Sequence, residues 1–300
     1  MKRMRLFIPL LLVCFLLTGC RFYFHINMPK EAEAEQQLPI GTDIDPKLTA
    51  KDLYWSTSYA ARNRPLHYHT KATIPLTFLD SGYGSMDLCH ERDVILDPDI
   101  SAVNVQTSIA MDNEEPDIYW EYYRDEDNRL ILYYYEESTG ECSREEIPLN
   151  GNTPFSIILD YTIERYPYYA EDLALEPQTR ILDEREVYVL TCRQAATYVL
   201  GTTGNAATDK LLAQRKIAST WYIDNESHQP VRQIIVLTEI DDLLGSMIDS
   251  IYGIGASEAQ VSIDGLTLQV DYLSFEPVEL PPVPDAVYRK AWNNAGFSAS

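Results

Sequence analysis

The sequence has few features that mark an enzyme. The nucleophile motifs Gly-x-Ser-x-Gly and Ser-x-x-Lys are both absent from its 300 residues. Gly253-Ile-Gly255 lacks the third glycine of a dinucleotide-binding loop and does not follow a predicted strand. Carboxylates are so numerous that no pair stands out as a glycosidase pair. The motifs therefore name no catalytic residue, and whether the chain is an enzyme stays open, with a non-catalytic role favoured.

Basic residues are scarce. The chain has 24 Lys and Arg residues against 46 Asp and Glu residues, which gives a formal net charge of −22. Nucleic-acid binding requires a basic surface, so the charge excludes nucleic acid as a partner. An acidic surface favours solubility and holds the folded part away from anionic lipid head groups.

Cysteine and histidine are too few for a disulfide scaffold or a persuasive metal centre. Beyond the first 20 residues, Cys89, Cys142 and Cys192 allow one internal disulfide at most, and their spacing fits no zinc motif. His67 and His69 share one face of a predicted strand, but a metal site there requires a third ligand, for which His90 is the candidate. We therefore expect no metal and no other cofactor.

The segment 125–130 also fails as a calcium-binding loop. Counted from Asp125, loop positions 5 and 6 hold Arg129 and Leu130 in place of an oxygen ligand and a glycine. We interpret this segment as a charged hairpin turn.

A short apolar run lies near the start of the chain. Three basic residues among the first five precede an apolar stretch over 6–17, which Pro9 interrupts and which is too short to span a membrane. The run ends in Leu17-Thr18-Gly19-Cys20, which resembles the lipobox of bacterial lipoproteins. The resemblance implies that 1–19 is a removed signal peptide and that Cys20 carries lipid.

This interpretation predicts where the protein acts. The chain is expected outside the cytoplasm, attached to a bacterial membrane by its N-terminal lipid, with either type of cell envelope possible. Residues 20–45 include a charged stretch poor in apolar residues and are predicted to form a disordered tether. A single α+β domain is expected over 46–292, followed by a frayed tail over 293–300.

The pattern within the domain is mainly β. Aromatic and β-branched runs around polar turns predict hairpins at 118–135, 216–240 and 259–275, the last with Asp264-Gly265 at its turn. Further strands are expected at 66–80, 86–96, 101–111 and 186–198, and helices from about residue 46 and at 153–167, 243–253 and 285–292. Since no βαβ alternation occurs, the fold class is α+β with a large antiparallel sheet.

One hairpin resembles a known family. Trp221-Tyr222-Ile223-Asp224, a polar turn and Pro230-Val231-Arg232 look like a hairpin of the LolA/LppX-like half-barrel lipoproteins. The resemblance covers a small part of the chain. It implies a large curved, half-barrel-like antiparallel sheet with a few helices packed on its concave face. It also implies a hydrophobic cavity for acyl chains or another apolar ligand, and no catalysis.

The candidate ligand-binding residues are the large side chains of two hairpins and of the helix predicted to cover them. They are Trp120, Leu132, Tyr134, Trp221, Ile235 and Met247. The sequence leaves open that the helix around Met247 fills the space with its own side chains. The function expected is a binding or chaperone-type module, with a lipid as a possible ligand. The alternatives are an envelope scaffold or sensor that binds another protein, and an extracytoplasmic hydrolase with a non-obvious site.

Overall fold

The structure is a computed structural model that describes most of the chain after residue 37. The described residues are 38–62, 64–78, 84–97, 99–111, 115–149, 151, 153–154, 170–197, 206–240, 243, 261–262 and 267–294. The predicted signal peptide, Cys20, the helix expected at 153–167 beyond residue 154, Met247 with most of its helix, and the tail from residue 295 lie outside them.

One antiparallel sheet contains all fourteen described strands. They are β1 (Ile40–Asp43), β2 (Leu66–Phe78), β3 (Gly84–Asp97), β4 (Ala102–Met111), β5 (Asp117–Glu126), β6 (Arg129–Glu136), β7 (Cys142–Ile147), β8 (Glu171–Leu175), β9 (Gln178–Leu182), β10 (Arg185–Ala195), β11 (Lys216–Asp224), β12 (Pro230–Val236), β13 (Val261–Ser262) and β14 (Thr267–Ser274). The described helices are α3 (Ala50–Arg62), α6 (Ala206–Gln214) and α8 (Asp285–Asn294), with a 3₁₀ turn, η3, at Thr238–Ile240.

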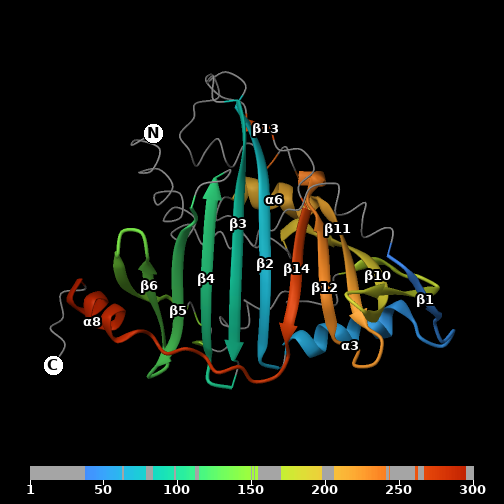
Figure 1. The fold of residues 1–300 in the computed structure, drawn as a ribbon, viewed down its shortest axis with the longest axis horizontal. Coiled ribbons are helices and arrows are strands. Elements are labelled where there is room, and N and C mark those ends of the chain that lie inside the picture. The colour runs from blue at the N-terminus through green and yellow to red at the C-terminus, as the bar shows by residue number, and fades with distance from the viewer. Residues whose placement is uncertain are drawn as a thin grey trace.

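The sheet consists of two runs of neighbouring strands joined by a strand from the end of the chain. Its order is β1-β9-β10-β11-β12-β14-β2-β3-β4-β5-β6-β7, with β8 paired to β10 and β13 paired to β2. The runs β9–β12 and β2–β7 are each consecutive in sequence, and β14 lies between them (Figure 1). Within the described strands, β1 and β7 are the two ends of the path, so the sheet is open.

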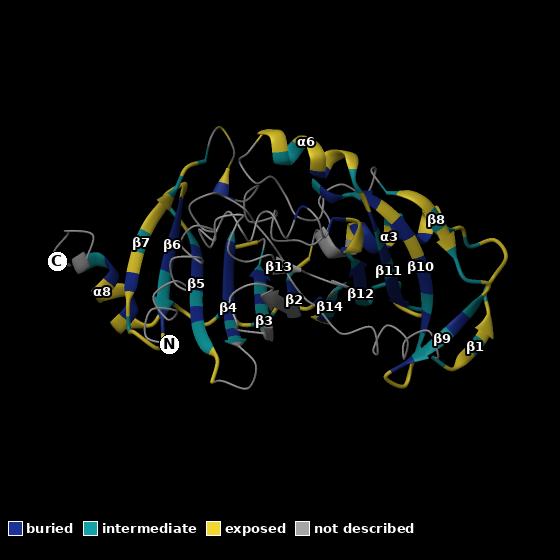
Figure 2. Ribbon diagram, turned by 90° about the horizontal axis from the view of Figure 1, so that it is seen from above, coloured by how far each residue is buried: buried dark blue, intermediate teal, exposed yellow. Residues whose placement is uncertain are grey.

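The sheet is strongly curved, and the helices lie on both of its sides. Figure 2 shows an arch with α3 and α6 on the concave side and α8 outside it, beside β7. Leu53 and Tyr54 of α3 and Leu212 of α6 belong to the large core cluster on the concave side. Val287 and Ala291 of α8 pack on Ile131 and Tyr133 of β6, which face the other way.

Local sequence explains the turns and the start of the first helix. The β5–β6 hairpin turns at Asp127 and Asn128, which both have positive φ values, 54° and 66°, as a type I′ turn requires. Asp183 and Glu184 do the same between β9 and β10. At the start of α3, the Thr49 hydroxyl accepts a hydrogen bond from the amide of Asp52 at 3.1 Å, which caps the helix.

The α+β fold class and the large antiparallel sheet are confirmed, and so are the hairpins at 118–135 and 216–240 and the helices that begin near residues 46 and 285. The hairpin at 259–275 was wrongly predicted, because β13 and β14 each pair with β2 and not with each other. The predicted tether was wrong for residues 40–43, because β1 pairs with β9. Cys89, Cys142 and Cys192 are not joined by a disulfide.

Candidate functional site

The concave face of the sheet gathers large side chains from both runs of strands. Alternation along each strand decides which residues lie there, since successive side chains point to opposite faces. Tyr123 pairs with both Val103 and Leu132, and all three belong to the core cluster that includes α3. The face of β5 that carries Tyr119, Glu121 and Tyr123 is therefore the concave one.

The concave face is apolar near α3. Leu53 of α3 is fully buried and belongs to one core cluster with side chains of β2, β3, β4 and β6. These side chains include Leu66, Tyr68, Val94, Leu96, Val103, Val105 and Leu132. Burial of a large apolar side chain contributes about 1.5–3 kcal/mol, so these side chains stabilise the fold.

One cross-strand row on this face is polar. Thr70 pairs with Arg92, Arg92 with Thr107, Thr107 with Tyr119, and Tyr119 with Glu136. We call these five residues the polar row. Four of them expose at most 6% of their surface, and the Arg92 side chain exposes 11%. The row continues through Val270 and Gln233 to Trp221 in the other run of strands.

The polar row holds an ion pair with its neighbour Glu121. A guanidinium nitrogen of Arg92 lies 3.6 Å from Glu121 Oε2, and the Glu121 side chain exposes 7% of its surface. Burial raises the pKa of the Glu121 carboxyl, and the charge of Arg92 acts in the opposite direction. Burial and the nearby carboxylates of Asp117 and Glu136 raise the pKa of Tyr119, so its hydroxyl stays protonated.

Three buried polar atoms on this row have no hydrogen-bond partner among the described residues. They are Thr70 Oγ1, Tyr119 OH and Trp221 Nε1, in side chains that expose 1% of their surface. Their neighbour Gln233 differs, because it accepts a hydrogen bond from Tyr272 at 3.3 Å and donates one to Ser219 at 3.4 Å. Buried polar groups in proteins are almost always hydrogen-bonded. Three buried polar atoms without a hydrogen-bond partner on one row, which we call the orphan groups, therefore need an explanation.

The structure places four of the predicted ligand-binding residues on the concave face. Leu132 and Tyr134 are alternate residues of β6, and Tyr134 stacks on Tyr119 with ring centroids 6.2 Å apart. Trp221 and Ile235 are each 1% exposed in the same core cluster. Whether these side chains bind a ligand stays a prediction.

Trp120 was wrongly grouped with these residues. It pairs with Tyr135 and stacks on Tyr122, with ring centroids 6.0 Å apart, in the cluster that α8 covers on the convex face. Its indole nitrogen donates a hydrogen bond to Glu137 at 2.6 Å. Adjacent residues of a strand face opposite ways, so Trp120 and Glu121 cannot serve the same face.

Sequence reasoning missed the polar row. Its members come from five strands. In each strand the member is an ordinary polar residue, and the sequence around it does not show that it is buried beside the other four. One local signal was visible at Glu121, because this carboxylate lies between Tyr119 and Tyr123, the two residues next to it on the same face of the strand. A charged residue in such a position must be paired or bound when it is buried.

The three histidines considered as metal ligands do not converge. His67 and His69 lie on the convex face, where His67 Nε2 is 2.9 Å from Asp93 and His69 Nε2 is 3.8 Å from Glu91. His90 pairs with Ala72 and Ile109, which places it on the concave face. It was therefore wrongly considered as the third ligand. Within the described part of the chain, no three His, Cys, Asp or Glu side chains are grouped so that they could hold a metal ion.

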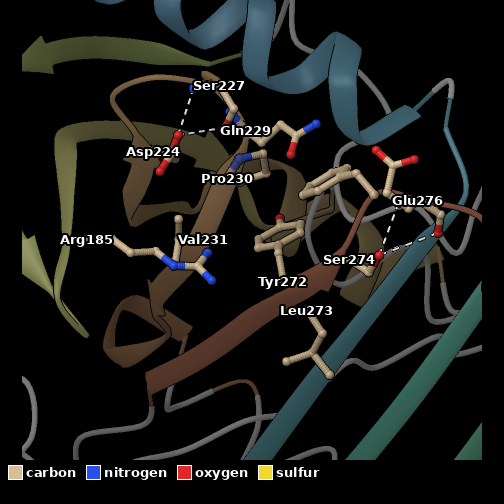
Figure 3. A pocket seen from close by; sticks show the side chains of 11 residues that line it. Arg185, Asp224, Ser227, Gln229, Pro230, Val231, Tyr272, Leu273, Ser274 and Glu276 are labelled. Atoms are coloured by element: carbon tan, nitrogen blue, oxygen red, sulfur yellow. Dashed lines mark hydrogen bonds between the residues drawn. The ribbon is translucent and has the colours of Figure 1, made fainter.

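A separate pocket opens at the rim of the sheet, where the β11–β12 turn meets the end of β14 (Figure 3). Its volume is about 260 Å³. The lining includes Arg185, Asp224, Ser227, Gln229, Tyr272, Ser274 and Glu276. Asp224 Oδ1 accepts hydrogen bonds from the amide of Ser227 at 2.7 Å and from its hydroxyl at 2.8 Å, and Ser274 Oγ accepts one from the amide of Glu276 at 3.1 Å. These polar groups serve the turns, so the concave face is the stronger candidate site.

No protein-family model and no curated protein sequence matches the chain. Among solved structures, LprF from Mycobacterium bovis is similar with a TM-score of 0.42 and 12% identity, over 81% of this chain and 99% of LprF. A beta-barrel-like protein of a domain of unknown function, DUF1849, from Brucella abortus is similar with a TM-score of 0.25 and 11% identity. That match covers 70% of this chain and 99% of the Brucella chain.

Proposed function

We propose that this chain is a binding module that holds an apolar ligand such as a lipid against the concave face of its sheet. The observation that supports it is the composition of that face. Large apolar side chains from both runs of strands surround a row with three buried polar atoms that the described protein leaves without partners. A ligand with an apolar body and some polar atoms satisfies both parts of such a surface.

The sequence adds a proposed location. The ending Leu17-Thr18-Gly19-Cys20 supports export and attachment to a bacterial membrane through lipid on Cys20. Among the described residues, no helix has the length and apolar character needed to cross a membrane. We infer that the folded part works at the outer surface of the membrane, where apolar ligands are at hand.

Two measurements test ligand binding. Mass spectrometry of the gently purified full chain looks for co-purified lipid, and titration with a fluorescent acyl-chain probe looks for saturable binding. We expect binding at micromolar probe, because apolar area buried on the ligand contributes about 25 cal/mol per Å² before the costs of association. If no lipid co-purifies and no saturable binding appears, the binding proposal fails and an interaction scaffold becomes the better interpretation.

A matched pair of variants tests whether the ligand binds on the concave face. Tyr134 and Trp120 are half-buried aromatic residues of neighbouring strands, and they lie on opposite faces of the sheet. We expect Tyr134→Ala to weaken probe binding at least about 5-fold and Trp120→Ala to leave it unchanged. The reverse result would move the site to the convex face.

A further inference from the structure

The charges around the polar row give the chemical class of the ligand's head. Arg92 is the basic member of the row, and Glu121 Oε2 lies 3.6 Å from it. Glu136, at the end of the row, is a second buried carboxylate, with 4% of its surface exposed. If Glu121 is ionised, these three groups sum to one negative charge. If Glu121 is protonated, Glu136 still balances Arg92. In both states the three groups offer an anion no surplus positive charge.

The orphan groups are best satisfied by a neutral ligand group that can both donate and accept hydrogen bonds. A hydroxyl of Thr or Tyr has one donor and accepting lone pairs, so Thr70 Oγ1 and Tyr119 OH each suit another hydroxyl. The two residues are three strands apart in the row, which is about 14 Å at about 4.8 Å per strand. A head with several hydroxyls meets such separated groups better than a single polar atom does.

We propose that the concave face selects amphiphiles with a neutral, hydroxyl-bearing head, bound by Thr70 and Tyr119, over fatty-acid anions of the same chain length. This inference rests on the proposed function, because the acyl chain would lie on the apolar part of the same face. Glycerol and sugar heads share this chemistry. A carboxylate head lacks the donors and meets Glu121 and Glu136 as like charges.

The test compares three probes that have a ten-carbon chain, namely monodecanoylglycerol, decyl glucoside and decanoate. The affinity of each is measured by its ability to displace the fluorescent acyl-chain probe from the full chain at neutral pH. We expect at least one neutral probe to bind more tightly than decanoate, and the better of the two neutral probes identifies the head as glycerol-like or sugar-like. Equal or tighter binding of decanoate would overturn the inference.

Tyr119→Phe tests the contact directly, because it removes one oxygen and keeps the ring. We expect it to weaken the binding of the better neutral probe about 2- to 10-fold and to leave the affinity for decanoate unchanged. Since the hydroxyl has no partner among the described residues, its removal should not lower the melting temperature. Thr70→Val is a second variant with the same expectation.

Tyr122→Phe is the matched control, because Tyr122 is a buried tyrosine of the same strand on the convex face. Unchanged neutral-probe affinity in both Tyr119→Phe and Thr70→Val overturns the inference but leaves the proposed function standing, provided that the fluorescent probe still binds. Absence of binding by the fluorescent probe and by all three amphiphiles removes the proposed function itself.

Discussion

Thr42 of the first strand is held by Glu186 of the tenth. The amide of Thr42 donates a hydrogen bond to Glu186 Oε1 at 2.8 Å, and its hydroxyl donates a second at 2.5 Å. Thr179 donates to the same oxygen, and Asn225 donates to Glu186 Oε2 at 3.1 Å. One carboxylate therefore joins β1 to β9, to β10 and to the β11–β12 turn.

The hydrogen bonds to Glu186 predict a pH dependence of stability. They lower the pKa of Glu186 to about 2, below the usual value near 4.3. A carboxyl with a lowered pKa in the folded state stabilises the protein above the unfolded pKa, and this contribution is lost as the pH falls towards 2. We expect Glu186→Gln to lower the free energy of unfolding at pH 7 and to have a shrinking effect between pH 4 and pH 2.

Urea denaturation at several pH values measures this effect. Glu145→Gln, at an exposed residue of β7, is the control and should change little at any pH. An effect of Glu186→Gln that is the same at pH 7 and pH 2.5 would contradict the assignment.

Gly41 is predicted to be intolerant of a side chain. A Cβ atom at residue 41 would lie 2.4 Å from Thr179 Oγ1 and 2.7 Å from Glu186 Oε1, closer than real Cβ contacts. We expect Gly41→Ala to reduce the free energy of unfolding by about 1–3 kcal/mol through this overpacking. Ile40→Ala is the control, because Ile40 is 60% exposed. Equal effects of the two substitutions would argue against the clash.

Removal of Glu121 is predicted to be costly because it leaves Arg92 buried without this partner. We expect Glu121→Ala to reduce the free energy of unfolding by about 3 kcal/mol or more, while the double change Arg92→Met with Glu121→Leu costs much less. The exposed pair Arg129 and Glu146, 3.8 Å apart, supplies the comparison. Glu146→Ala should cost about 0.5 kcal/mol or less. If the effects of Arg92→Met and Glu121→Leu, each made alone, add up to the effect of the double change, the coupling is contradicted.

Cys20 is predicted to attach the protein to the membrane. In cells, Cys20→Ser should release the protein from the membrane fraction or block removal of 1–19, because acyl chains on the cysteine supply the attachment. Cell fractionation and mass spectrometry of the N-terminus measure both effects. An unchanged membrane fraction for the variant, with no lipid mass on the unaltered protein, would disprove the lipoprotein interpretation.

Alternation along β5 could be predicted from sequence, but the identity of each face could not. The residues 118–123 show that Trp120 and Tyr119 point opposite ways, yet both faces carry aromatic groups. The convex face is apolar there because α8, more than 150 residues further along, packs on it. A local pattern contains no information about that distant helix.

The polar row was hidden for a similar reason. Thr70, Arg92 and Tyr119 become neighbours through the register of four strands, and register between strands depends on contacts along their whole length. The hairpins 118–135 and 216–240 were predictable, because their turns and aromatic runs are local signals. The predicted hairpin at 259–275 was wrong because both of its strands pair with the long strand β2.

The position of β14 in the sheet limits the order in which the parts of the sheet can form during synthesis. Among the described strands, the one that joins the two runs of the sheet comes last along the chain, and its partners β2 and β12 are synthesised before it. Until residues 267–274 emerge, the two halves have no common strand, and pairings so distant in sequence form slowly. The two halves of the sheet therefore stay unjoined until late in synthesis, and such a delay would favour the export before folding that we propose from Leu17-Thr18-Gly19-Cys20.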